Sequence, residues 1–102
     1  MNNISFVSEK EFKDFYYEKS SGRPRFDFFI EDKYVIEYDG IQHFKEVDIF
    51  KTDTLLDRQI KYNQKNEWCK KNNIPIIRIP YYHLKKIKIE DLLLETSEFI
   101  IK

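Results

Sequence analysis

The sequence has little of the residues that interrupt regular structure or cross-link a chain. Its 102 residues include no alanine, two glycines, three prolines and one cysteine, Cys69. A single cysteine excludes an internal disulfide and is typical of a reducing compartment, so we expect a cytoplasmic protein. No apolar run approaches the roughly 20 residues of a membrane helix and no signal peptide is recognisable, so we expect no membrane association. The length predicts a single domain over residues 1–102.

The net charge is zero, yet the two halves of the chain differ in sign. Residues 1–50 carry 11 acidic and 7 basic side chains, and residues 51–102 carry 7 acidic and 11 basic ones. The acidic excess is concentrated in residues 27–48, which contain seven acidic residues and only two basic ones, Lys33 and Lys45. A basic half beside an acidic centre suits an enzyme that acts on a polyanion with a bound cation, and two solvated surfaces explain the charges equally well. The lack of a net basic charge argues against strong independent binding to nucleic acid.

The acidic stretch contains two runs of aromatic and β-branched residues on either side of residues 31–33, which predict a β-hairpin. Asp27, Glu37 and Asp39 interrupt these runs, although strands of this type normally form a core where an unpaired carboxylate is costly. A three-residue loop pairs Asp27 with Glu37 and places Asp39 one step along the same face. A two-residue loop would put Asp27 and Glu37 on opposite faces. A shared carboxylate site therefore predicts an odd loop length.

Three helices and a third strand are predicted around this hairpin. A capping-box pattern that begins at Ser8 predicts a first helix, which the Ser-Ser-Gly run at 20–22 ends. A second helix is expected over about 53–73, and residues 74–79 predict a buried strand parallel to the second hairpin strand, because such crossovers are right-handed. A last amphipathic helix is expected over about 90–100. The fold class is therefore α/β, a small mixed β-sheet (antiparallel hairpin plus a parallel strand) flanked by helices in the order α-β-β-α-β-α.

The acids of the hairpin suit phosphodiester hydrolysis, which needs a metal, an activated water and a proton for the leaving oxygen. Mg²⁺ usually takes one or two carboxylates together with waters and substrate phosphate. Asp27, Glu37 and Asp39 are the candidate ligands, and Mn²⁺ is expected to substitute for Mg²⁺. Each acid alone is explained as a surface or turn residue, so the prediction depends on the three lying on one strand face.

Basic side chains elsewhere complete this chemistry. His43 would move protons, since imidazole titrates near neutrality. Taken alone, His43 is more simply a structural histidine, and the neighbouring acids favour the catalytic interpretation. Lys61 or Arg78 would stabilise the charge on the phosphorane, and His83 is expected to be structural or to contact phosphate.

Four segments together resemble the PD-(D/E)XK nuclease superfamily. They are Arg-x-Asp-Phe at 25–28, Ile-Glu-Tyr-Asp-Gly-Ile-Gln-His-Phe at 36–44, a helix that carries Asp57 and Lys61, and Ile-Ile-Arg-Ile-Pro at 76–80. Within the superfamily the chain looks most like the branch of the very-short-patch repair endonucleases. In that branch it is similar to the catalytic domain of phage homing endonucleases with a Glu, Asp, x, His, Asp pattern. The resemblance covers about residues 8–80 and implies a restriction-endonuclease-like fold and metal-dependent cleavage of DNA.

The resemblance assigns roles to individual residues of this sequence. Asp27 matches the metal ligand of the first hairpin strand, where Arg25-Phe26 replaces an expected Pro. Gln42 and His43 match the x-His pair, and Asp48, five residues after His43, matches the final Asp. These residues are therefore the implied catalytic set, with Asp27 also binding the metal.

Two further matches leave alternatives. Glu37 and Asp39 match the acidic run before the Gly, and Asp39 occupies the position where the wider superfamily has a Lys, so proton and phosphate handling must differ here. Glu11 is the implied leading helix Glu, with Glu9 and Glu18 also in range. Glu11 is explained as well by a capping-box contact near the start of the first predicted helix.

The acids of the hairpin predict a Mg²⁺-dependent DNA endonuclease. The resemblance implies that it is encoded by a phage and acts in the cytoplasm of a bacterial host, as the cutting part of a homing endonuclease. Its DNA-recognition segment would lie elsewhere in the full-length protein, and a double-strand break would need a homodimer or two successive nicks. The alternatives are a nicking repair or restriction-type endonuclease, an inactive nuclease-like domain for DNA binding or assembly, and an unrelated α/β protein. The Cys/His set of the zinc site in the repair enzymes is absent, which argues against mismatch repair.

Overall fold

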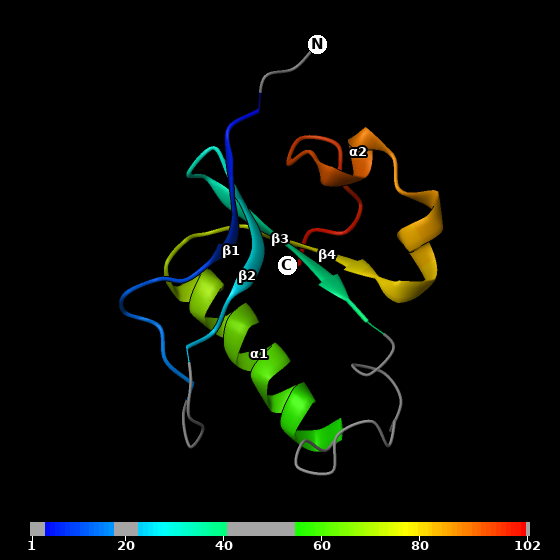
Figure 1. The fold of residues 1–102 in the computed structure, drawn as a ribbon. Coiled ribbons are helices and arrows are strands. Elements are labelled where there is room, and N and C mark those ends of the chain that lie inside the picture. Colours follow the sequence, from blue (N-terminus) through cyan, green and yellow to red (C-terminus); the bar gives the residue numbers. More distant parts are fainter. Residues whose placement is uncertain (1–3, 18–22, 41–54, 102) are drawn as a thin grey trace.

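The computed structural model describes residues 4–17, 23–40 and 55–101, and its centre is a four-stranded mixed sheet in the order β1-β2-β3-β4. The strands are β1 (Phe6–Lys10), β2 (Phe26–Ile30), β3 (Tyr34–Asp39) and β4 (Ile76–Pro80). Helix α1 (Leu55–Lys71) lies across one face, and the 3₁₀ helix η2 (Tyr81–Lys86) and short helix α2 (Ile89–Leu92) lie toward the other (Figure 1). The α/β class with a mixed sheet is confirmed, but the order is β-β-β-α-β followed by η2 and α2. None of the helices in the described part of the chain has the length and apolar character needed to cross a membrane.

The hairpin of β2 and β3 has the predicted odd loop. Ile30 pairs with Tyr34, so the three residues Glu31-Asp32-Lys33 form the turn. The first two turn residues have positive φ values of 49° and 54°. This left-handed conformation is uncommon outside glycine and is used here to reverse the chain within three residues. Continued along the strands, the register sets Asp27 opposite Glu37, as the sequence predicts.

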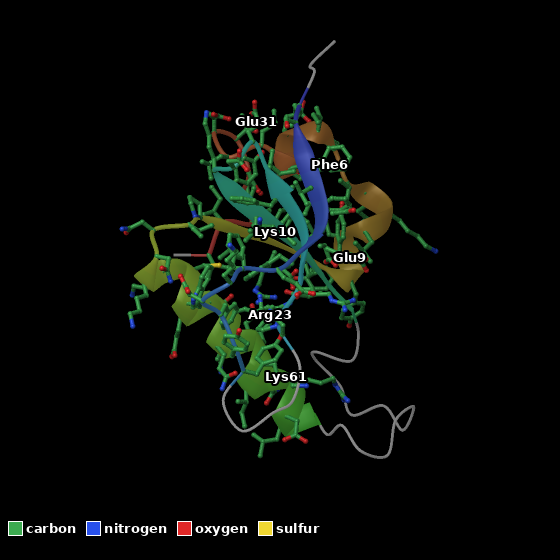
Figure 2. The ribbon with its side chains drawn as sticks, turned by 60° about the vertical axis from the view of Figure 1, so that its left-hand side comes forward. Phe6, Glu9, Lys10, Arg23, Glu31 and Lys61 are labelled. Carbon is green, nitrogen blue, oxygen red and sulfur yellow. The ribbon has the colours of Figure 1, made fainter. Side chains whose placement is uncertain are left out.

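Strand β1 replaces the first predicted helix. It pairs antiparallel with β2, from Phe6 opposite Ile30 to Lys10 opposite Phe26, and Figure 2 shows it along the outer edge of the sheet. The helix prediction from Ser8 is wrong because a capping box is a local preference worth about 1 kcal/mol. The edge of β2 instead offers a row of unpaired backbone donors and acceptors, which β1 satisfies. Tertiary pairing therefore overrides the local preference.

The β3-α1-β4 unit agrees with its prediction. Strand β4 runs parallel to β3 and ends with Pro80 opposite Asp39. Helix α1 is followed by Asn73, whose positive φ of 58° turns the chain back toward the sheet. Because α1 connects the two parallel strands, its first turns lie near the end of the sheet where β3 and β4 finish (Figure 1). This end of the sheet is where Asp39 lies.

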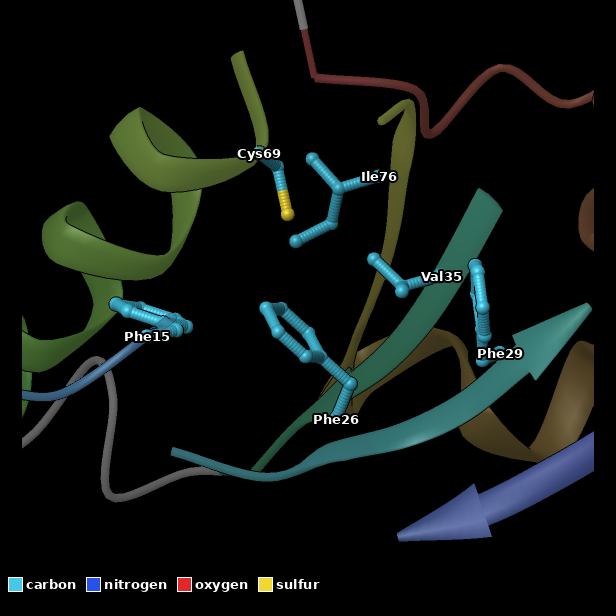
Figure 3. Close-up of a cluster of buried hydrophobic side chains, with 6 residues drawn as sticks. All are labelled: Phe15, Phe26, Phe29, Val35, Cys69 and Ile76. Carbon is cyan, nitrogen blue, oxygen red and sulfur yellow. The ribbon is translucent and has the colours of Figure 1, made fainter. Parts of the chain in front are cut away.

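An aromatic core lies between α1 and the sheet. Its buried members are Phe15, Phe26, Phe29, Val35, Cys69 and Ile76 (Figure 3). The ring of Trp68 stacks on Phe15, with 4.8 Å between the centroids and 8° between the planes. Such a ring pair adds about 0.5–1.5 kcal/mol to the roughly 1.5–3 kcal/mol gained by burying each large apolar side chain. This packing fixes α1 over β2 and β3.

The chain that follows β4 covers the other face of the sheet. A second cluster of buried residues, Ile30, Tyr34, Ile36, Ile77 and Ile79, packs against side chains of the segment from Ile87 to Ile100. The predicted helix over 90–100 is wrong, because α2 ends at Leu92 and Ile100 forms an antiparallel bridge with Ile77. Backbone bonds from the last described residues satisfy the outer edge of β4. A helix in their place would leave that edge unpaired.

Candidate active site

Asp27 and Glu37 are tied together at the open end of the β2–β3 hairpin. The N–H of Asp27 donates to Glu37 Oε1 at 2.8 Å, and Asp27 Oδ2 accepts from the N–H of Tyr38 at 2.7 Å. The last ladder pair before them is Phe28 with Ile36. Each carboxylate thus accepts a hydrogen bond from a backbone N–H of the opposite strand. In a regular ladder a backbone carbonyl oxygen would accept that bond. This arrangement holds both carboxylates at one end of the hairpin.

Lys65 of α1 brings a positive charge to this pair. Its Nζ lies 2.8 Å from Glu37 Oε2, and the two side chains are 13% and 8% exposed. The same ammonium group donates to the carbonyl of Arg25 and lies 5.1 Å from the centre of the Phe26 ring. Shielding from water strengthens such a charge-assisted bond. Sequence reasoning points to Lys61 and misses Lys65, which lies one helical turn further on the same side of α1, so the i, i+4 spacing is the signal that finds it.

Asp39, the third acid of the hairpin, is held by Arg78 of β4. Arg78 Nη1 lies 2.7 Å from Asp39 Oδ1, and both residues are buried. The other guanidinium nitrogens donate to Asn66 Oδ1 at 2.7 Å and to the carbonyl of Tyr62 at 3.2 Å, both on α1. The planar fork of an arginine makes these three bonds at once. Arg78 therefore connects β3, β4 and α1.

We call the set Asp27, Glu37, Asp39, Lys65 and Arg78 the ion cluster. Burial changes the cost of ionising its side chains. Three carboxylates and two cations leave a formal charge of −1 when all five side chains are ionised. Desolvation raises the pKa of Glu37 above its ordinary value of 4.5, and attraction by Lys65 acts against that rise. Buried charges are tolerated only when they are paired.

Tyr17 adds a phenol group at the edge of the ion cluster. Burial, with a smaller contribution from the negative charge of Glu37, raises the pKa of Tyr17 to about 12, and Arg78 acts in the opposite direction. Lys61, a predicted phosphate-binding residue, has its Nζ 5.3 Å from the centre of the Tyr17 ring. Tyr17 therefore stays a neutral hydrogen-bonding group near pH 7.

Two of the three hairpin acids, Asp27 and Glu37, remain as candidate oxygen ligands for a divalent metal. Mg²⁺ is commonly held by one or two carboxylates together with water and substrate oxygens, and these two side chains meet that requirement. Asp39, predicted as a third ligand, is engaged by Arg78. Within residues 4–17, 23–40 and 55–101, no group of three or more His, Cys, Asp or Glu side chains is arranged to hold a metal ion. Asp27 and Glu37 therefore remain as the candidate ligands, and Glu37 Oε2 is itself bonded to Lys65 Nζ at 2.8 Å.

The remaining predicted site residues lie away from the ion cluster or outside the described residues. Outside the described residues are Gln42, His43, Asp48 and Glu18. Glu11 follows β1 and pairs with Arg25 at 3.2 Å and with Arg23 at 3.8 Å. Its predicted place on a helix is wrong, because the residues before it pair with β2. Glu9, the alternative, lies in β1 with its side chain exposed.

His83 lies in η2 and has a structural contact. Its Nε2 is 2.9 Å from Asp91 Oδ2, and its ring centroid is 4.7 Å from that of Phe99. Asp91 Oδ2 also accepts from the N–H of Lys88, and this bond, followed by the one to His83, lowers the pKa of Asp91. His83 therefore connects η2 to α2, the structural one of its two expected roles.

Comparison of the chain with known protein families, with curated proteins and with solved structures gives no match. The nuclease resemblance is therefore a prediction that rests on the sequence motifs at 25–28, 36–44 and 76–80. The described structure adds the geometry of the ion cluster to those motifs.

Proposed function

We propose that this chain is the catalytic domain of a metal-dependent DNA endonuclease, the cutting part of a phage homing endonuclease. The observation that carries the proposal is the pairing of Asp27 with Glu37 at one end of the hairpin, with the Lys65 ammonium group 2.8 Å from Glu37. Phosphodiester hydrolysis uses carboxylates that hold a metal and a cation that stabilises the charge on the phosphate, and the described site brings two carboxylates and a cation together. A restriction-endonuclease-like arrangement, with acids at the end of a hairpin beneath a helix, belongs to the same proposal.

In the proposed mechanism the acidic and the basic residues of the ion cluster have different roles. Asp27 and Glu37 would hold Mg²⁺ or Mn²⁺, which when bound supplies a Lewis acid for the phosphate oxygens. Lys65 holds the Glu37 carboxylate in the described structure, and a metal bound to Glu37 would free its ammonium group for the phosphate, in place of the Lys that Asp39 replaces. Arg78 neutralises Asp39 and keeps β3 and β4 together beside the site.

Proton transfer is assigned to the segment that follows β3 in the sequence. His43 would take a proton from the attacking water or give one to the leaving oxygen, with Asp48 and Gln42 assisting it. Glu11 pairs with Arg25, two residues before Asp27, so we assign it to holding the start of β2. His43→Ala is expected to abolish cleavage and to leave the unfolding transition unchanged.

Cleavage of supercoiled plasmid with Mg²⁺ or Mn²⁺ tests the proposal, with Asp27→Asn as the variant. Asparagine retains an oxygen that can accept the Tyr38 N–H, so the variant loses the charge and keeps the bond. We expect no nicked or linear product from Asp27→Asn. The matched control is Glu31→Gln, because the exposed Glu31 lies at the turn end of the same hairpin. Full activity of Asp27→Asn would overturn the assignment.

A second candidate function is that of an inactive nuclease-like domain that binds DNA or assembles with a partner. It is favoured by the engagement of Glu37 and Asp39 with Lys65 and Arg78, since a purely structural polar cluster needs such pairing. Calorimetric titration with Mn²⁺ separates the two candidates. Metal binding that is lost in Asp27→Asn is expected of the endonuclease, and no binding is expected of the inactive domain or of an unrelated α/β protein.

The partners and setting of the proposed enzyme follow from charge and composition. Double-stranded DNA is the substrate, and target recognition is assigned to another segment of the full-length protein because this chain has no net charge. A double-strand break would need two such sites, hence a homodimer or two successive nicks. A nicking repair or restriction-type enzyme would share the site, and the ratio of nicked to linear product on matched and mismatched DNA distinguishes it. The buried free thiol of Cys69 suits the bacterial cytoplasm.

A further inference from the structure

The segment from Tyr81 to Lys88 carries three lysines and no acidic residue. Lys85, Lys86 and Lys88 are exposed. The segment begins directly after β4, whose last residue pairs with Asp39 of the ion cluster. The segment starts at the end of the sheet that holds the carboxylates, and η2 leads from there toward α2, with the three positive charges in its second half and just after it (Figure 1).

Tyr82 connects this basic segment with the ion cluster. A hollow of about 250 Å³ at the end of β4 is lined by Asp39, Arg78 and Tyr82, together with Tyr62, Pro80 and Glu98. In a 3₁₀ helix, residues three apart eclipse each other along the axis. Lys85 therefore lies on the same side of η2 as Tyr82, one turn or about 6 Å further along the helix axis.

Contacts on the body of the protein fix the position of the lysines. His83 Nε2 lies 2.9 Å from Asp91 Oδ2, and the same oxygen accepts from the Lys88 N–H at 2.9 Å. The His83 ring also packs on Phe99, which follows the turn after α2. His83 and Lys88 are thus joined to one carboxylate, which preorganises the backbone that carries Lys85 and Lys86 between them.

We propose that Lys85, Lys86 and Lys88 form a phosphate-binding surface for the backbone of double-stranded DNA and bring it to the hollow beside Asp39 and Arg78. This inference rests on the proposed function and places its substrate on the protein. Charge complementarity selects the partner, because phosphates are regularly spaced negative charges that a row of lysines neutralises. The surface also offsets a repulsion, since an ion cluster with a formal charge of −1 would disfavour the approach of a polyanion.

Fluorescence anisotropy of a labelled duplex in EDTA, measured at increasing NaCl concentrations, tests the proposal without cleavage. The variant is Lys85→Gln/Lys86→Gln/Lys88→Gln. Its matched control is Lys33→Gln/Lys70→Gln/Lys71→Gln, which removes the same charge from exposed positions at the other end of the sheet. We expect the η2 variant to bind at least tenfold more weakly and to lower the slope of log K against log[NaCl] by about 2 to 3, because each phosphate contact contributes about 0.9.

The outcomes separate this inference from the proposed function. Equal loss of binding in the two triple variants, or no loss in the η2 variant, overturns the phosphate-binding surface even if the protein cuts plasmid. Loss confined to the η2 variant supports the surface even if no plasmid is cut, in which case the endonuclease proposal fails alone. Unfolding of both triple variants at the wild-type denaturant midpoint is the folding control. Single-stranded RNA or anionic phosphatidylserine vesicles bound more tightly than the duplex would also overturn the choice of partner.

Discussion

Lys65 Nζ and Glu37 Oε2 form an ion pair 2.8 Å long in a place from which water is largely excluded. Glu37 lies on β3 and Lys65 on α1, 28 positions later in the chain. The pair exists because the aromatic core holds α1 over the hairpin. It connects the fold of this protein to the chemistry proposed for it.

Lys65→Met should lower the free energy of unfolding by about 2–3 kcal/mol at pH 8. The change leaves the buried Glu37 carboxylate without its close partner, and breaking a buried pair from one side costs more than removing both charges. Urea denaturation measures the loss, with the exposed Lys70→Met as the control. Lys65→Met/Glu37→Gln should recover most of the stability, and a double variant no more stable than Lys65→Met would contradict this account.

The stability of the wild type should carry a pH dependence that comes from Glu37. Burial raises the pKa of this carboxyl above 4.5, so the folded state binds the proton more tightly than the unfolded chain does. The contribution is fully present below pH 4.5 and is lost as pH rises through the raised pKa. The free energy of unfolding of wild type minus that of Glu37→Gln should therefore decrease with rising pH and then level off. A difference that increases with pH would show that the pKa is lowered instead.

Arg78→Lys should destabilise the protein by about 3 kcal/mol although the charge is kept. A lysine cannot bond Asp39, Asn66 and the Tyr62 carbonyl together, because it lacks the planar fork of the guanidinium group. Thermal unfolding followed by circular dichroism measures the change. Arg25→Lys, whose side chain is 62% exposed, is the control and should unfold like the wild type.

Cys69 should be unreactive in the folded protein. Its side chain is fully buried, and burial raises the pKa of the thiol to about 12, so little thiolate forms at pH 8. A disulfide-exchange reagent at pH 8 is expected to label Cys69 only as fast as the protein unfolds. Rapid stoichiometric labelling without denaturant would mean that the core between α1 and the sheet is open.

Lys65 and a divalent metal should compete for Glu37 if the proposed function holds. The Lys65 ammonium group is bonded to Glu37 Oε2 in the described structure, so a metal held through Glu37 would have to share or displace that contact. Lys65→Met is therefore expected to bind Mn²⁺ about tenfold more tightly, equivalent to about 1.4 kcal/mol. Calorimetry measures the affinity, and Asp27→Asn supplies the background. Weaker binding in Lys65→Met would mean that the lysine organises the carboxylates for the metal instead of excluding it.

The hairpin and the crossover to β4 could be predicted because their signals are local or periodic. Positive φ at Glu31 and Asp32 serves the three-residue turn that the pairing of Asp27 with Glu37 requires. β1 could not be predicted, since the pattern at Ser8 suits a helix and only the free edge of β2 makes a strand better. The helix that the sequence predicts over about 90–100 is wrong for the same reason, because Ile100 pairs with the edge of β4.

The candidate site divides in the same way between sequence and tertiary structure. The sequence by itself determined that Asp27 and Glu37 can share a face only if the hairpin loop has an odd length, because side chains alternate along a strand. The structure decided the loop length, which is three residues. Only the tertiary structure decided the partners of the acids, Lys65 for Glu37 and Arg78 for Asp39. These contacts join residues far apart in the chain, and burial makes such pairing obligatory without specifying, in the sequence, which cation will provide it.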